Sequence, residues 1–209
     1  MTQRKVTALR VQKRNKERVN VFLDGEYAFA VSLKSAAKLK RGQTLSAGEI
    51  VQLEGEGDAD LAYHRALRYL GYRPRSEFEI THYLRGKDHD DATIAQVLEK
   101  LRARSYVDDR AFAEFWVDNR MRFRPRGERA LRAELRQKGV GNRIIDAVLQ
   151  TQDESEAALQ ALEQRAERWR TLEQDEFTKK ALGYLSRRGF PYAVCRETTE
   201  TVWSRLHGD

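Results

Sequence analysis

The chain has 209 residues, of which 40% are hydrophobic and 34% are charged, and its formal net charge is +7. This length fits one or two ordinary domains or several small repeats, and the basic balance suits a polyanionic or acidic partner. The single cysteine, Cys195, excludes an internal disulfide framework, and no apolar run approaches the roughly 20 residues of a membrane helix. We therefore expect a cytoplasmic protein with no signal peptide and no membrane association.

The pattern at the start of the chain predicts β structure. Residues 5–11, 18–23 and 26–31 alternate apolar and polar side chains, which is typical of three antiparallel strands. Between the second and third runs, Asp24 and Gly25 supply the positive φ angles that a two-residue hairpin turn requires.

The loop between the first two predicted strands is basic. It contains Lys13, Arg14 and Lys16, which suit contacts with nucleic-acid phosphates. Solvated charge on a hairpin edge, which protects a sheet against unwanted strand pairing, explains them equally well. Both interpretations stay open, and the loop is one candidate binding segment.

Two short helices are expected after the strands. Ser32 is a candidate N-cap for a helix through Lys40. Ser46 begins a capping box with Glu49, which predicts a second short helix. An acidic segment with two glycines then marks a boundary, so the N-terminal domain is expected to cover residues 1–57.

An internal repeat dominates the rest of the chain. Aligning residues 73–98 with 124–149, 51 positions apart, gives ten identities in 26 positions and begins with Arg-Pro-Arg in both copies. A weaker third copy aligns residues 185–190 with 135–140 and lacks the Arg-Pro-Arg element. Self-similarity at this period is typical of stacked units that form long binding surfaces.

Each repeat is predicted to contain three helices separated by glycine and proline turns. Repeat 1 is expected at 58–105, repeat 2 at 106–152 and repeat 3 at 153–209. Aromatic residues in these repeats have helical spacing and apolar neighbours, which favours core packing over stacking on bases. They are Tyr106, Phe112, Phe115, Trp116, Trp169 and Trp203.

Four segments of the helical part carry a family signature. They are Ala66-Leu67-Arg68-Tyr69-Leu70 with Arg73-Pro74-Arg75-Ser76-Glu77, Tyr106-Val107-Asp108-Asp109, Arg124-Pro125-Arg126-Gly127, and Arg188-Gly189-Phe190. In their order and spacing they resemble the RecX family, regulators of the bacterial RecA recombinase. Ser105 departs from the glycine usual before the Tyr106 segment, and Gly86 lies earlier than the turn glycine of the second repeat.

The resemblance implies a mainly α fold of three tandem three-helix repeats in an elongated, curved body. A small N-terminal antiparallel β region with short helices precedes the repeats. It also implies a regulatory protein that binds the RecA–DNA filament and modulates RecA's recombinase and ATPase activity in DNA repair, recombination and the SOS response. Inhibition is the expected direction.

Arginines dominate the candidate binding residues. Guanidinium groups at equivalent corners of successive repeats suit bidentate contacts with carboxylates or phosphates of a repeating partner. A solvated turn, or a solvated helix face, is the alternative for each of them. The candidates in the repeats are Arg73, Arg75, Arg124, Arg126, Arg129, Arg132 and Lys138.

The sequence contains no catalytic constellation, so we expect a protein that is not an enzyme and that needs no cofactor. No histidine pair has metal-ligand spacing, and Cys195 fits a helical core better than a nucleophile. A monomer is expected, with the RecA filament as partner and weak binding to single- or double-stranded DNA. The alternative function is a helical module that binds DNA or RNA directly, without RecA.

Overall fold

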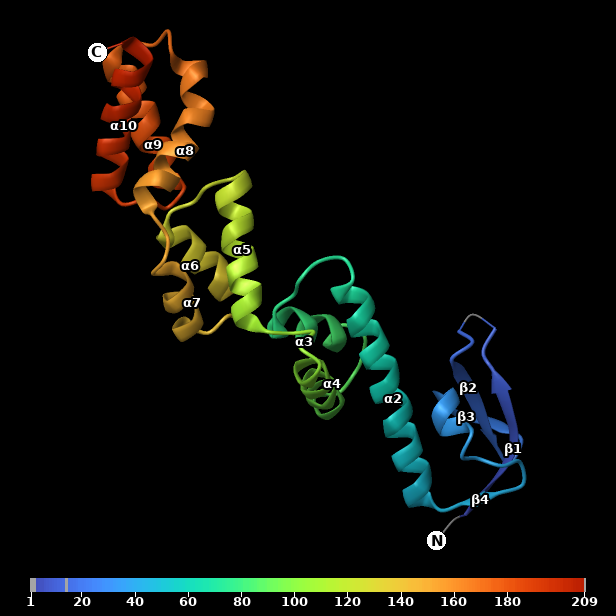
Figure 1. Cartoon of the computed structure of the whole chain (residues 1–209). Helices are drawn as coiled ribbons and strands as arrows, with labels where there is room; N and C mark the ends of the chain where they lie inside the picture. The colour runs from blue at the N-terminus through green and yellow to red at the C-terminus, as the bar shows by residue number, and fades with distance from the viewer. Residues whose placement is uncertain (1–2, 14, 209) are drawn as a thin grey trace. The chain divides into compact units, whose positions relative to one another are not determined.

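A small antiparallel sheet lies at the N-terminal end of the chain (Figure 1). Within residues 3–13 and 15–208, which the computed structural model describes, it has four strands in the order β3-β2-β1-β4. The three predicted strands are confirmed, whereas β4, which pairs with β1, was not predicted. The strands are β1 (Arg4–Val11), β2 (Arg18–Leu23), β3 (Glu26–Ser32) and β4 (Thr44–Leu45).

The hairpin between β2 and β3 turns as predicted. Asp24 and Gly25 have φ angles of 52° and 91°, the left-handed conformation that this turn demands. Ser32 then caps α1 by accepting a hydrogen bond from the Ser35 backbone N–H. The helix is shorter than predicted, because α1 covers only Leu33–Ala36.

A single long helix replaces the short helix and the break expected after the sheet. The capping box of Ser46 and Glu49 is confirmed, but α2 then runs without interruption from Ala47 to Leu70. Residue 57 lies inside this helix, where Gly57 packs against β3: a Cβ there would lie 2.2 Å from the Ala30 carbonyl oxygen. The glycine thus allows close helix–strand contact, and the predicted break was wrong.

The remaining helices follow in groups of three, and the mainly α fold class with three three-helix repeats is confirmed. The end of α2 packs with α3 and α4, α5 with α6 and α7, and α8 with α9 and α10. Their bounds are α3 (Glu77–Arg85), α4 (Asp91–Ala103), α5 (Asp109–Phe123), α6 (Glu128–Gln137), α7 (Asn142–Leu149), α8 (Glu154–Ala166), the short 3-10 helix η1 (Glu167–Trp169), α9 (Gln174–Arg187) and α10 (Tyr192–His207).

The chain divides into two units, each described separately. The first comprises Met1–Arg73 and Ile80–Val107, and the second comprises Pro74–Glu79 and Asp108–Asp209. The segment 74–79, which contains most of the first Arg-Pro-Arg element, therefore belongs with the second and third repeats. No helix in the described part of the chain has the length and apolar character needed to cross a bilayer.

The same turn ends the middle helix of all three repeats. Its left-handed residue is Asp88, Gly139 or Gly189, with φ angles of 62°, 76° and 93°. The next backbone N–H bonds back to the carbonyl of Leu84, Leu135 or Leu185, which closes the helix end. In repeat 1 the left-handed position is Asp88 and not Gly86. Ser105, the other departure from the family pattern, also adopts a positive φ, of 55°.

The residue after this turn enters the core in every repeat. Val140 and Phe190 are apolar, whereas repeat 1 places His89 there with only 5% of its surface exposed. Arg65 Nη1 lies 2.8 Å from His89 Nε2, and His89 Nδ1 lies 2.8 Å from Asp58 Oδ2. Since a guanidinium only donates, Nε2 accepts and the Nδ1 proton faces Asp58. Both partners lie on α2, so this polar contact fastens the turn to that helix.

The prediction that the aromatic residues form cores is confirmed for four of the six. Phe112 is buried, and Trp116, Trp169 and Trp203 pack against cores. It was wrong for Tyr106 and Phe115, which are 53% and 37% exposed. Cys195 is buried in the third repeat, as expected.

Candidate partner-binding surface

The first Arg-Pro-Arg element leads into a docking contact. The buried Ser76 donates its hydroxyl to the Lys138 carbonyl at 2.6 Å and accepts from the Glu79 backbone N–H. The Glu77 backbone N–H donates to Asp109 Oδ1 at 2.9 Å. Residues 76–79 therefore join the end of α6 to the start of α5. We call this contact the first joint.

The residues after the second Arg-Pro-Arg element make an equivalent contact 51 positions later, with a backbone N–H in place of the serine hydroxyl. The Gly127 backbone N–H donates to the Arg188 carbonyl at 3.1 Å, at the end of α9. The Glu128 backbone N–H donates to Glu154 Oε1 at 2.7 Å, at the start of α8. This contact, the second joint, is tighter, because a Cβ on Gly127 would lie 2.5 Å from the Gly189 carbonyl oxygen.

The second arginine of each element is held by a carboxylate. Arg75 lies 3.9 Å from Glu79, and its side chain is only 14% exposed. Arg126 Nε lies 3.1 Å from Glu134 Oε1. Both guanidinium groups are thus engaged inside the second unit. The first arginines differ, since Arg73 is half-buried and Arg124 is exposed.

The candidate arginines of α6 also have partners. Arg129, although exposed, donates to the Ser186 carbonyl at 3.1 Å. Arg132 bonds Glu128 at 2.7 Å and also Asp146, and these two hydrogen bonds raise the pKa of its guanidinium.

Lys138 connects the first joint to a wider polar network. Its Nζ lies 2.9 Å from Glu79 Oε1 and 5.1 Å from the centre of the Trp116 ring. The Trp116 Nε1–H and the Arg120 Nε–H both donate to Glu134 Oε2 at 2.7 Å. Glu134 therefore restrains Arg120, Arg126 and Trp116 together. A carboxylate with this many donors fixes the geometry of the surface around it.

The basic loop between β1 and β2 exposes the two candidate lysines. Lys13 and Lys16 are exposed, and Arg14 lies outside the described residues. Nearby, Arg18 points inward and donates to the carbonyls of Gly57 and Ala30. Burial of this guanidinium group lowers the pKa of Arg18. It is a structural link between β2, β3 and α2.

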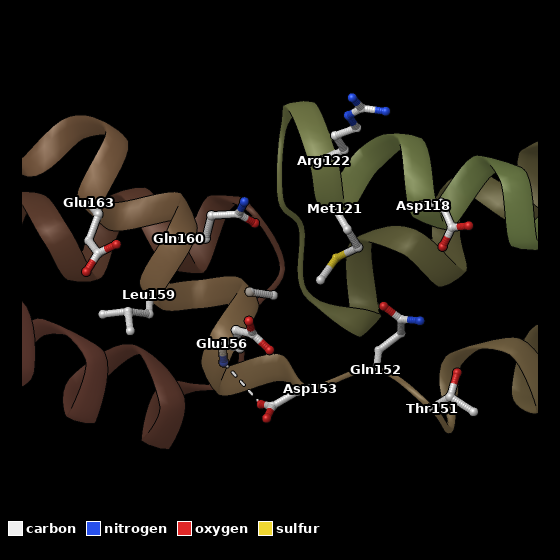
Figure 2. Close-up of a pocket in the computed structure, with 11 residues that line it drawn as sticks. Asp118, Met121, Arg122, Thr151, Gln152, Asp153, Glu156, Leu159, Gln160 and Glu163 are labelled. Atoms are coloured by element: carbon white, nitrogen blue, oxygen red, sulfur yellow. Dashed lines mark hydrogen bonds between the residues drawn. The ribbon is translucent and has the colours of Figure 1, made fainter.

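An acidic groove lies between α5 and α8 in the second unit. Figure 2 shows Asp118, Met121 and Arg122 on α5, with Glu156 and Glu163 across the groove on α8. Its volume is about 630 Å³. Another wall residue, Asp153, is occupied as the N-cap of α8, where it accepts from the Ser155 and Glu156 backbone N–H groups. Among the described residues no group of His, Cys, Asp and Glu is arranged to hold a metal ion.

Sequence reasoning identified the cations but missed their partners. Glu79, Glu134 and Asp109 decide which arginines and backbone groups are engaged. Lys138 and Glu79 are 59 residues apart in the chain, so no local spacing connects them. Their positions offered no common signal, because Asp109 begins the first helix of repeat 2, whereas Glu79 and Glu134 lie on the middle helices of repeats 1 and 2.

The fold and its two joints define a protein of tandem three-helix repeats preceded by a small sheet. Family models match almost the whole chain: "Regulatory protein RecX N-terminal domain" at residues 4–46, and the first, second and third RecX three-helix domains at 62–101, 108–149 and 152–198. The chain belongs to the RecX family of regulatory proteins.

Individual relatives agree with this assignment. "Regulatory protein RecX" of Bacillus licheniformis is 34% identical over 195 residues, covering 90% of this chain and 74% of the relative. "Regulatory protein RecX" of Bacillus subtilis is 30% identical over 220 residues, covering 98% of this chain and 83% of the relative. A crystal structure of regulatory protein RecX matches with a TM-score of 0.71 and 29% identity over 94% of this chain and 99% of that one. A crystal structure of RecX from Lactobacillus salivarius shares the fold, with a TM-score of 0.60 and 24% identity. The match covers 72% of this chain and 97% of that one.

Proposed function

We propose that this protein binds the RecA–DNA filament and inhibits RecA's recombinase and ATPase activity, without a catalytic reaction of its own. The observation that carries the proposal is the match to all four RecX domains in order along the chain. A repeated protein also suits a polymeric partner, because a second contact with the same polymer is nearly intramolecular. The expected setting is the cytoplasm, as a monomer.

The arginines divide into two groups under this proposal. Arg124 and Arg129 are exposed and can meet an acidic or phosphate partner directly. Arg75, Arg126 and Arg132 would exchange their internal carboxylates for the partner's, so their net contribution to binding is smaller. We therefore expect most of the binding energy of the second repeat to come from the exposed group.

The test is RecA's DNA-dependent ATPase rate, measured with increasing amounts of the full-length protein. The unmutated protein should lower the rate, and the double variant Arg124→Ala/Arg126→Ala should need about tenfold more protein for the same effect, the loss of about 1.4 kcal/mol. Unfolding curves check that the variant is folded. The matched control is Arg143→Ala/Arg187→Ala, two exposed arginines of the same unit. Equal inhibition by both double variants would reject the assigned site, and no inhibition by the unmutated protein would reject the function.

The second candidate function is direct binding to nucleic acid, independent of RecA. The observation that favours it is the excess of positive charge in this chain, +7 overall. Binding to bare DNA with a steep dependence on salt, and no effect on RecA, would support this alternative over the first.

A further inference from the structure

A second hollow in the second unit is lined by arginines. It has a volume of about 260 Å³ and lies where the end of α5 meets α8 and α9. None of the side chains that line it is acidic. They are Phe123, Arg124, Gln164, Arg165, Arg168, Tyr184 and Arg188.

No carboxylate in the described part of the chain pairs with the positive charge of this hollow. Within residues 3–13 and 15–208, no salt bridge involves any of its four arginines, whereas Arg75, Arg126 and Arg132 each meet a carboxylate. The pKa of Arg188 reflects this: burial lowers it, and so do the charges of Arg126, Arg165 and Arg124, against an opposing effect of Tyr184. Like charges gathered without counter-charges favour an anion from outside.

Two of the four arginines of the hollow, Arg188 and Arg165, are positioned by neutral groups. Arg188 Nη1 donates to the Pro125 carbonyl at 2.8 Å, and its guanidinium carbon lies 4.6 Å from the centre of the Tyr184 ring. The Arg165 guanidinium lies 5.8 Å from the same ring. One aromatic ring thus lies beside two guanidinium groups, and the N–H groups of Arg165 and the remaining N–H groups of Arg188 are left for a ligand. Ordering them in advance lowers the entropic cost of binding.

We propose that this hollow binds a backbone phosphate of a single-stranded nucleic acid and that the Phe123 ring stacks on an adjacent base. Planar guanidinium forks match phosphate oxygens, and the Phe123 side chain is 61% exposed at the rim. A cationic hollow with an exposed aromatic ring is the combination that binds single strands without sequence preference. The proposal deepens the proposed function, because it gives the regulator a direct contact with DNA.

The test uses the full chain without RecA, so it does not depend on the proposed function. Fluorescence anisotropy of a labelled oligothymidylate measures the Kd over a range of salt concentrations. We expect Arg165→Glu/Arg168→Glu to weaken binding more than tenfold and to reduce the log–log salt slope by about 0.7, the value for one lost phosphate contact on a single strand. Thermal unfolding confirms that the variant is folded.

Matched variants separate the site from general charge effects. Arg143→Glu/Lys179→Glu makes the same charge change at exposed residues away from the hollow and should alter Kd by less than threefold. Arg165→Lys/Arg168→Lys keeps the charge but removes the forks, and should give an intermediate loss. The proposal would be overturned if Arg165→Glu/Arg168→Glu and Arg143→Glu/Lys179→Glu weakened binding equally, or if neither weakened it.

Phe123→Ala tests whether the ligand of the hollow is a single-stranded nucleic acid. Stacking contributes about 1–3 kcal/mol per base, so Kd should rise at least fivefold for the oligothymidylate and remain unchanged for a duplex of the same length. Inorganic phosphate and a polyglutamate peptide serve as competitors. If polyglutamate displaces the strand at lower concentration than phosphate, and Phe123→Ala has no effect, the hollow is a site for acidic protein segments and the proposal is wrong.

RecA's ATPase rate is measured in parallel with the same variants. If the unmutated protein binds the oligothymidylate through this hollow but leaves RecA unaffected, the proposed function fails and the inference stands. If RecA is inhibited equally by the unmutated protein and by Arg165→Glu/Arg168→Glu, while all variants bind the strand alike, the inference fails and the proposed function stands.

Discussion

The two joints of the second unit share a backbone contact but differ in charge. In each, the N–H that begins a middle helix donates to an acid at the start of the following repeat, Asp109 in one and Glu154 in the other. In the first joint, Lys138 at the end of the middle helix meets Glu79. In the second, Arg188 holds the equivalent place, and Ala130 aligns with Glu79.

The carboxylate beside Lys138, which Arg188 lacks, is the main difference in charge between the two joints. One backbone contact, from the N–H of Glu77 or Glu128, is common to both joints and lies directly after each Arg-Pro-Arg element. One carboxylate decides whether the cation at the helix end is neutralised. In the first joint Glu79 pairs with Lys138, whereas in the second no carboxylate among the described residues pairs with Arg188.

The largest effect is expected from Gly127→Ala. A Cβ there meets the Gly189 backbone, so the variant should lose about 2–3 kcal/mol of unfolding free energy through overpacking. Gly141→Ala is the control, because Gly141 is also an N-cap glycine but has no atom within 4 Å of the added carbon. Chemical denaturation of both variants gives the comparison. Equal stability would show that the second joint is loose.

Glu79→Ala would remove the carboxylate beside the helix-end cation of the first joint, as in the second joint, where Ala130 is the equivalent residue. Lys138 and Arg75 then lose their shared carboxylate in half-buried places, and we expect a loss of about 2 kcal/mol in stability. Binding of the oligothymidylate should become tighter by severalfold, because Lys138 becomes available. Glu197→Ala removes an exposed glutamate and serves as the charge control. Unchanged stability for Glu79→Ala would mean that the joints do not differ in the way described.

Ser76→Ala tests the cap that the second joint lacks. The hydroxyl links the Glu79 N–H to the Lys138 carbonyl, so its removal should cost about 1 kcal/mol. The substitution leaves the charges unchanged, and oligothymidylate binding should stay the same. Equilibrium unfolding and anisotropy together check this. A change in binding without a change in stability would contradict the structural role.

The smallest effect concerns Cys195, in the repeat behind the second joint. Burial raises the pKa of its thiol above the ordinary 9.0, so the folded state favours the protonated form. The resulting stability is fully present below 9.0 and is lost as the pH rises through the folded value. The difference in unfolding free energy between the unmutated protein and Cys195→Ala should therefore be constant below 9.0 and shrink above it. A constant difference at all pH values would show that the thiol is accessible to solvent.

Local signals predicted the local structure of this protein well. The Asp24-Gly25 hairpin and the cap at Ser46 depend on neighbouring residues, and both were predicted from the sequence. The continuity of α2 was missed, because Gly57 was interpreted as a break when its role is contact with Ala30 on a strand far earlier in the chain.

The candidate site was harder to predict than the fold. The sequence identified cations such as Arg126, but whether a cation is available depends on carboxylates brought close only by folding. Glu134 reaches Arg120 from 14 residues away, and Glu79 reaches Lys138 from 59. Arg165 carried no motif, and Arg188 was identified only as part of the third-repeat turn, because the feature that the two share is the Tyr184 ring.

The histidine after the first-repeat turn has a consequence for folding fidelity. Similar tandem modules are prone to swap equivalent segments and misassemble. His89 is satisfied by Asp58 and Arg65, which lie on α2 alone, whereas the equivalent residues of the other modules are Val140 and Phe190. An exchange of segments would bury the polar ring of His89 among hydrocarbon side chains without a hydrogen-bond partner, which costs free energy. This contact therefore disfavours misassembly of the first module with either of the others.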